Sequence, residues 1–391
     1  MRLAARLQKL QSNVFSLMDE AKGRARRSGL TVVDLSLGSS DIAPPPAALA
    51  QLKASVDDST SHGYLLFQGT TNFRKACAQW YFERFGIEVN PETEILPLIG
   101  SQEGTALIPL AVMNPGDFAL LLDPGYPSHI GGVHLAGGQI YPLALKPEQG
   151  YLPELEAIPQ EVLEQSRLLI LSYPHNPTAA TATQAFFAHA VDFCRRHGIV
   201  LVHDFPYSDF VLEGERAPSI FQADTKREVA IEFFSFSKSY HMGGFRIGFA
   251  IGNHELITAL SQVKANINFC PYRGILDAAE VALSTHQDYI DQAMAIFRGR
   301  RDSAIAALAE IGWPAPKPLA TMYLWTPVPK AWKGKSVDFC VALVEATGVA
   351  LAPGSGFGDS GEGYVRFALV RDEEVLRESI LKIAAFLKAL D

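Results

Sequence analysis

The chain has 391 residues, which is long enough for two domains. Apolar residues make up 48% of it, enough for a substantial core, and its formal net charge is -8. This net negative charge favours solubility and argues against a protein that binds nucleic acid.

The N-terminal stretch over residues 1–29 is basic, but Asp19 and Glu20 interrupt it and no signal-type apolar segment follows. We therefore predict a helical arm that belongs to the folded protein rather than a targeting peptide. The segment "TVVDLSLGSSD" (31–41) then resembles a strand that enters a loop. The longest apolar stretch, around 106–122, is broken by "NPGD" (114–117), so we expect no membrane span.

Short apolar runs with polar or glycine ends recur through the middle of the chain. They are "ILPLIG" (95–100), "FALLLD" (118–123), "RLLILSY" (167–173), "GIVLVHD" (198–204) and "VAIEFFSFS" (229–237). Each is too short for a buried helix and does not alternate, which is typical of strands covered on both faces. Helical stretches such as 183–198 lie between several of them, so the pattern predicts an α/β fold with a mostly parallel sheet.

The pattern changes after about residue 276. Residues 276–312 read as long helix, and 321–329 and 363–370 read as strands, which predicts a second, smaller α+β domain. We expect an N-terminal arm and part of the small domain over 1–47, a large domain over 48–275, and an interdomain helix with the small domain over 276–391. The four cysteines, at 77, 194, 270 and 340, show no paired spacing, which argues against a zinc site and suits a reducing, cytoplasmic compartment.

Polar residues of chemical interest follow several of the predicted strands, where ligands of parallel sheets gather. Ser101 and Gln102 in "GSQEG" begin a predicted helix, whose free N–H groups can bind an anion, although a serine cap is the simpler interpretation. Tyr126 in "DPGYPSH" can stack on a flat ring or pack over a turn. Asn176 in "YPHNPTAA" precedes a proline, which by itself indicates a turn.

Asp204 closes the strand "GIVLVHD", and Tyr207 follows three residues later. A carboxylate at a buried strand end needs a cationic or donor partner, and a protonated ring nitrogen would serve. His175 and His203 lack the spacing of metal ligands, so we expect no metal.

Lys238 in "SFSKSYHMGGFRIGF" carries the strongest signal in the sequence. Apolar surroundings at a strand end favour its uncharged amine, the form that attacks an aldehyde to give a Schiff base. Ser235 and Arg246 would hold a phosphate beside it. Arg366, inside the apolar strand "GYVRFAL", either pairs with a surface acid or binds a substrate carboxylate.

Together these segments resemble the class I/II aminotransferases of fold type I, which use pyridoxal 5′-phosphate (PLP). The resemblance covers nearly the whole chain and rests on S-x-S-K followed by G-x-R-x-G and on the order Asn176, Asp204, Tyr207, Lys238, Arg246, Arg366. The resemblance implies the sheet of fold type I, which is mostly parallel, has seven strands and lies between helices. Within the family, "SQEG", "MYLW" and the lysine segment look most like the alanine and LL-diaminopimelate aminotransferase-like branch.

The resemblance implies a role for each residue in moving an amino group from an L-amino acid to a 2-oxo acid by a ping-pong reaction. Lys238 would be the Schiff-base lysine and proton shuttle, and Asp204 would keep the ring nitrogen protonated. Asn176 and Tyr207 would donate to the phenolic oxygen, and Tyr126 would stack on the ring. Ser101, Gln102, Ser235 and Arg246 would cradle the phosphate, with Tyr64 reaching the phosphate of the other subunit of a homodimer. Arg366, Asn176 and the backbone near Gly38 would bind the substrate carboxylate.

Other activities stay open at this point. A β-lyase or decarboxylase-like enzyme can share the same cofactor residues, and so can a PLP-binding regulatory module, although the arm is too short for a DNA-binding domain. A nicotinamide dehydrogenase is disfavoured because no G-x-G-x-x-G follows a first strand. The sequence does not name the donor, and Arg273 either reads a distal carboxylate or is structural.

Overall fold

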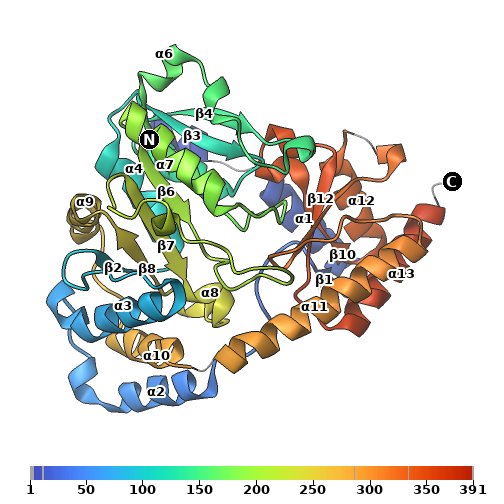
Figure 1. Ribbon diagram of the computed structural model, residues 1–391. Helices are drawn as coiled ribbons and strands as arrows, with labels where there is room; N and C mark the ends of the chain where they lie inside the picture. The colour runs from blue at the N-terminus through green and yellow to red at the C-terminus, as the bar shows by residue number, and fades with distance from the viewer. Residues whose placement is uncertain (1–3, 11–12, 286, 333, 390–391) are drawn as a thin grey trace.

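The computed structural model describes residues 4–10, 13–285, 287–332 and 334–389. Its largest sheet, in the order β2-β8-β7-β6-β5-β3-β4, lies beside a smaller α+β layer in Figure 1. The strands of the large sheet are β2 (Ile95–Leu98), β3 (Phe118–Asp123), β4 (Gln139–Ala144), β5 (Ser166–Leu171), β6 (Val200–Asp204), β7 (Ala230–Ser235) and β8 (Gly248–Gly252). β8 runs antiparallel to both of its neighbours, and the other pairings are parallel. The predicted α/β class with a mainly parallel sheet is therefore confirmed.

Both faces of the large sheet are buried, because its strands carry apolar side chains on both sides. Leu168 and Ile170 face one hydrophobic cluster, whereas Leu169 and Leu171 face another. The first face is covered by α4 (Ser101–Val112), α5 (Pro127–Leu135) and α9 (His254–Ala265), and the second by α3 (Thr71–Phe85) and α7 (Gln184–His197). This sandwich of helix, sheet and helix explains the unalternating apolar runs of the sequence.

The five strands expected in the middle of the chain all form, but β4 and β8 are not among the expected runs. β4 lies at the edge of the sheet, and several of its side chains are exposed. β8 begins and ends with glycine because neighbouring backbone lies close: a Cβ on Gly248 would lie 2.5 Å from the carbonyl oxygen of Phe234.

The smaller layer is built from both ends of the chain. β1 (Val33–Asp34) pairs in parallel with β10 (Val349–Ala350). β11 (Ala352–Pro353), β12 (Tyr364–Ala368) and β9 (Tyr323–Pro327) form an antiparallel sheet in that order. Three helices accompany these strands: α1 (Asn13–Arg27), α12 (Ser336–Thr347) and α13 (Glu373–Lys388). The N-terminal arm therefore packs with the C-terminal part of the chain, which is the darker blue beside orange and red in Figure 1.

The segment 276–312, read from the sequence as long helix, is two helices. α10 (Arg273–Leu283) ends where the hydroxyls of Ser284 and Thr285 bond back to the carbonyl of Val281, and α11 (Gln287–Glu310) follows. Such side-chain bonds compete with the helical ladder and favour its end. The remaining helices are α2 (Pro46–Asp57), α6 (Gln160–Leu163) and α8 (Phe236–Ser239).

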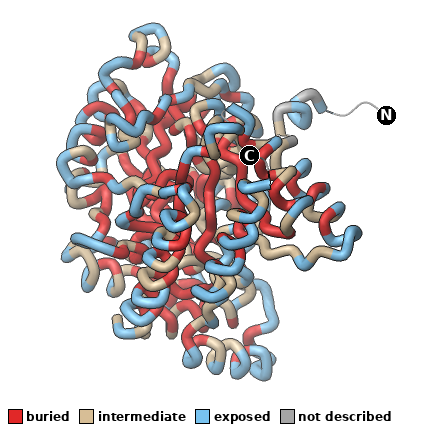
Figure 2. The backbone as a smooth tube through the Cα atoms, turned by 90° about the vertical axis from the view of Figure 1, so that its right-hand side faces the viewer, coloured by how far each residue is buried: buried red, intermediate tan, exposed pale blue. Residues whose placement is uncertain are grey.

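Buried residues fill the interior of the molecule, and exposed residues lie on its outer turns, as Figure 2 shows. The carboxyl ends of β5 and β6 lie where the large sheet meets the smaller layer, and β7 leads directly into α8 there. Among the described residues, no helix is long and apolar enough to cross a membrane.

Candidate active site

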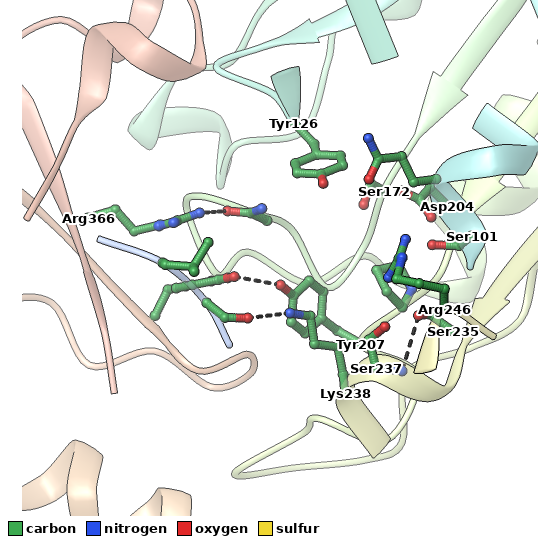
Figure 3. A pocket seen from close by; sticks show the side chains of 16 residues that line it. Ser101, Tyr126, Ser172, Asp204, Tyr207, Ser235, Ser237, Lys238, Arg246 and Arg366 are labelled. Atoms are coloured by element: carbon green, nitrogen blue, oxygen red, sulfur yellow. Dashed lines mark hydrogen bonds between the residues drawn. The ribbon is translucent and has the colours of Figure 1, made fainter. Parts of the chain in front are cut away.

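A cavity of about 200 Å³ lies at the carboxyl ends of the parallel strands, closed on its other side by the arm and by β9 and β12. Figure 3 shows the side chains that point into it. It is lined by Leu37, Gly38, Ser101, Gln102, Tyr126, Ser172, Asn176, Asp204, Pro206, Tyr207, Ser235, Ser237, Lys238, Arg246, Tyr323 and Arg366. Every site residue expected from the sequence lines this cavity except Tyr64.

Asp204, the last residue of β6, is buried with one carboxylate oxygen in use. Its Oδ2 lies 3.0 Å from Nε2 of His129, whereas Oδ1 is buried and has no hydrogen-bond partner among the described residues. A buried carboxylate oxygen without a donor is costly, so the site favours a ligand with a protonated nitrogen at this point. His129 was not expected from the sequence, although it stands one helical turn after Tyr126 on α5.

Lys238 lies in α8, which begins directly after β7. The Ser235 hydroxyl caps this helix by accepting a bond of 3.2 Å from the backbone N–H of Ser237. The Lys238 Nζ donates to the carbonyl oxygen of Gly38 at 2.5 Å and lies 5.7 Å from the centroid of the Tyr207 ring. The amine is thus held at the centre of the cavity, between the arm and the sheet (Figure 3).

The N-terminus of α4 lies beside Arg246, and we call this cluster of hydrogen-bond donors the anion cradle. The residue before the helix is Gly100, and no side chain caps it, so the serine-cap interpretation of "GSQEG" is wrong. A Cβ on Gly100, which has a φ of +76°, would lie 2.6 Å from Nη2 of Arg246. Free N–H groups, the helix dipole and a guanidinium therefore converge beside the hydroxyls of Ser235 and Ser237.

Arg366 approaches from β12 on the opposite side of the cavity. Its Nη1 donates to Oδ1 of Asn176 at 2.6 Å, and its Nη2 donates to the carbonyl oxygen of Ser36 at 2.6 Å. The guanidinium carbon lies 4.1 Å from the Tyr323 ring centroid and 4.6 Å from that of Phe357. A cation held between two ring faces has a fixed plane, which suits two-point binding of a carboxylate.

Tyr323 is a lining residue that sequence reasoning missed. Its hydroxyl lies 2.8 Å from that of Tyr207. Burial and the neighbouring phenol raise the pKa of Tyr207 well above its ordinary value. The pKa of Tyr323 is lowered overall. Burial acts to raise it, but the charges of Lys238 and Arg366 and the hydrogen bond with Tyr207 have the larger, opposite effect.

The same phenol explains why residue 38 is a glycine. A Cβ there would lie 1.9 Å from the Tyr323 hydroxyl oxygen. The sequence pattern "MYLW" placed Tyr323 in a strand, but nothing in it indicated that the strand faces the arm.

Tyr64 and Arg273 lie outside the cavity of their own chain. The Tyr64 side chain is 90% exposed, and its ring centroid lies 5.6 Å from that of Phe269. Arg273 begins α10, where its Nε lies 3.8 Å from Oδ1 of Asp277, and it lines a separate surface hollow with Ser55.

Comparison with known proteins agrees with this geometry. Residues 30–383 match the family described as aminotransferase class I and II. The chain is 39% identical to an LL-diaminopimelate aminotransferase of Gloeobacter violaceus over 386 residues, covering 98% of each chain. It is 40% identical to one of Dehalococcoides mccartyi over 386 residues, covering 99% of each chain.

Solved structures of similar fold agree with the family match. A probable N-succinyldiaminopimelate aminotransferase from Thermus thermophilus superposes with a TM-score of 0.90 at 40% identity, covering 95% of this chain and 100% of that one. Substrate-bound BacF from Bacillus subtilis superposes with a TM-score of 0.94 at 32% identity, covering 99% and 98%.

Proposed function

Because this chain belongs to the aminotransferase class I and II family and is a PLP-dependent aminotransferase, we propose that Lys238 is the residue that carries its reaction. The observation that carries this proposal is the position of the Lys238 amine. It lies in one cavity with the unpartnered Asp204 oxygen, the anion cradle at Arg246 and the Arg366 fork.

The residues of the cavity fit PLP. The unpartnered Oδ1 of Asp204 matches a protonated pyridine nitrogen, and the cradle of Ser101, Ser235 and Arg246 matches a phosphate. Tyr126, at the rim, presents a ring that can cover a flat heterocycle. Asn176 and Tyr207 can donate to the phenolic oxygen.

When bound, PLP supplies an aldehyde that an amine can attack and a ring that withdraws electrons from the amino acid. The Lys238 Nζ would move the proton between the substrate Cα and the aldehyde carbon (C4′) of the cofactor. Asp204 would hold the protonated ring nitrogen through its charge, because this attraction is stronger in a buried site than in water. Arg366 and Asn176 hold the α-carboxylate and so fix where the Cα proton points.

We propose an L-amino acid of the diaminopimelate class as the first donor to test, because relatives in both comparisons carry that substrate in their names. The test records the absorbance of the PLP-loaded protein before and after adding LL-diaminopimelate without an oxo acid. We expect the visible band to fade and a near-ultraviolet band to rise, and a 2-oxo acid to reverse the change. A spectrum that LL-diaminopimelate leaves unchanged would contradict this choice of donor.

We also propose that the enzyme works as a homodimer in the cytoplasm, with Tyr64 reaching the phosphate site of the partner. The support is the exposed aromatic pair of Tyr64 and Phe269 and the four free cysteines. Mixing inactive Lys238→Ala with Tyr64→Ala subunits tests it. Hybrid dimers would contain one intact site and regain activity, whereas a Tyr64 that serves its own chain would give no recovery.

A further inference from the structure

The end of β3 is bonded to a loop that belongs to the smaller layer. Asp123, the last residue of β3, accepts hydrogen bonds from the backbone N–H of Ser360 at 3.2 Å and from its hydroxyl at 3.0 Å. Two residues on, the Gly125 N–H donates to the carbonyl oxygen of Phe357 at 2.7 Å. We call these contacts the 123/360 clamp.

The loop has the conformation that this contact demands. Gly358 lies between Phe357 and Ser360 with a φ of +128°, a region that side chains rarely adopt. A Cβ on Gly358 would lie 2.0 Å from Oδ1 of Asp123. The approach of the Asp123 carboxylate therefore requires glycine at this position, both for its backbone angle and for its lack of a side chain.

Each end of the clamp continues directly into a lining residue of the cavity. On the β3 side, Gly125 is followed by Tyr126. On the other side, the Phe357 ring lies 4.6 Å from the guanidinium carbon of Arg366. Tyr126 and Arg366 come from different layers of the molecule, and both line the cavity (Figure 3).

The ionised form of the Asp123 carboxylate is disfavoured by its surroundings in the clamp. Burial raises the pKa of Asp123, the bonds from Ser360 oppose this rise, and the charge of Asp359 adds to it. The net rise means that the ionised group is less stable here than in water. Its bonds from the Ser360 N–H and hydroxyl hold the carboxylate in this half-buried position.

We propose that Asp123 and Ser360 are positioning residues that set the distance between the Arg366 fork and the Tyr126 ring, and so set the affinity for the α-carboxylate of every donor. The inference rests on the proposed role of Arg366 as the carboxylate fork. Neither Asp123 nor Ser360 lines the cavity, so both act through Phe357 and the 124–126 turn.

The test compares Ser360→Ala with Ser355→Ala in the PLP-loaded enzyme. Ser355 lies in the same loop, but its hydroxyl bonds to Ser336 within the smaller layer at 3.1 Å, which makes it a matched control. We expect Ser360→Ala to raise KM for each amino acid donor about 3- to 10-fold, the effect of losing one hydrogen bond to a charged group while the backbone bond remains. The kcat, the Kd for PLP and the Tm should stay near wild type, and Ser355→Ala should leave KM unchanged.

Gly358→Ala provides a second variant, with an expected KM increase of about ten-fold or more because it displaces the whole loop. Arg366→Ala is measured in parallel. If Arg366→Ala leaves KM unchanged, the carboxylate role of Arg366 fails, and the clamp's role with it. If Arg366→Ala raises KM while Ser360→Ala changes only Tm or nothing, the clamp is structural and the inference is overturned although the proposed function stands.

Discussion

The two sides of the cavity are built in different ways. On the cofactor side, Ser101, Asp204 and Lys238 lie at the ends of strands of one sheet or within three residues of them, so the topology of that sheet brings them together. On the substrate side, Arg366 bonds to Ser36, and Tyr323 lies against Gly38. These contacts join the first and last parts of the chain. The cofactor side is therefore fixed by local order within a rigid sheet, whereas the substrate side depends on how remote segments pack.

Lys238 lies between the cofactor side and the substrate side of the cavity. Its replacement by alanine should have the largest effect on turnover. Loss of the amine should lower turnover by about a thousand-fold or more, because no other described lining residue offers an amine base. The measurement is the rate of the absorbance change on adding donor. Lys226→Ala, at a surface lysine, serves as control. Near-normal turnover in Lys238→Ala would mean that the reaction does not use this residue.

Asp204→Asn tests the cofactor side alone and should be the next largest effect. The amide keeps the shape of the carboxylate but removes its charge, so we expect kcat to fall about 100- to 1,000-fold. We also expect a weaker Kd for PLP, measured by titrating its absorbance. Asp192→Asn, on the exposed face of α7, is the control. An unchanged kcat and Kd would show that the unpartnered Asp204 oxygen does not face the ring nitrogen.

Arg366→Ala tests the substrate side alone. We expect kcat/KM to fall for all amino acids. The fall should correspond to a loss of roughly 2–5 kcal/mol of transition-state binding, the cost of leaving a buried charge without its partner. The Kd for PLP should change little, which separates the two sides of the cavity. Arg377→Ala, on the exposed face of α13, provides the comparison. Values of kcat/KM within a few-fold of wild type would remove Arg366 from the carboxylate site.

His241→Asn should leave catalysis nearly unchanged but alter acid stability. Burial lowers the pKa of His241 to about 4, with the charges of Lys238 and Arg300 in the same direction and Asp41 opposing. A depressed folded-state pKa gives stability that is present above the ordinary value of 6.5 and is lost as pH falls toward 4. The loss amounts to about 3 kcal/mol at its limit.

Asparagine tolerates the positive φ of 55° at this position and does not titrate. Urea unfolding at several pH values should therefore show the wild type losing stability relative to His241→Asn below pH 6.5. Near pH 8 the offset between the two should be constant. Parallel profiles throughout would rule out a buried neutral imidazole.

The strand ends were predictable from the sequence because each carries its own signal. An apolar run followed by a polar residue marks Asp204 and Lys238 without reference to any other part of the chain. The edge strand β4 and the glycine-bounded β8 were not among the five expected runs. Tyr323, His129 and Ser36 were missed for another reason: their importance arises from contacts with residues far away in the chain, which no local pattern encodes.

The parallel pairing of β1 with β10 has a consequence for how the chain is made. Val33 finds its partner only in Val349, so the arm leaves the ribosome long before the strand that completes it. At roughly 5–20 residues per second, the intervening synthesis takes about 15 to 60 s. The large sheet can fold in that interval, but the substrate side of the cavity cannot. Truncated chains that stop before β10 should therefore bury the cofactor side while the arm remains open to proteases and chaperones.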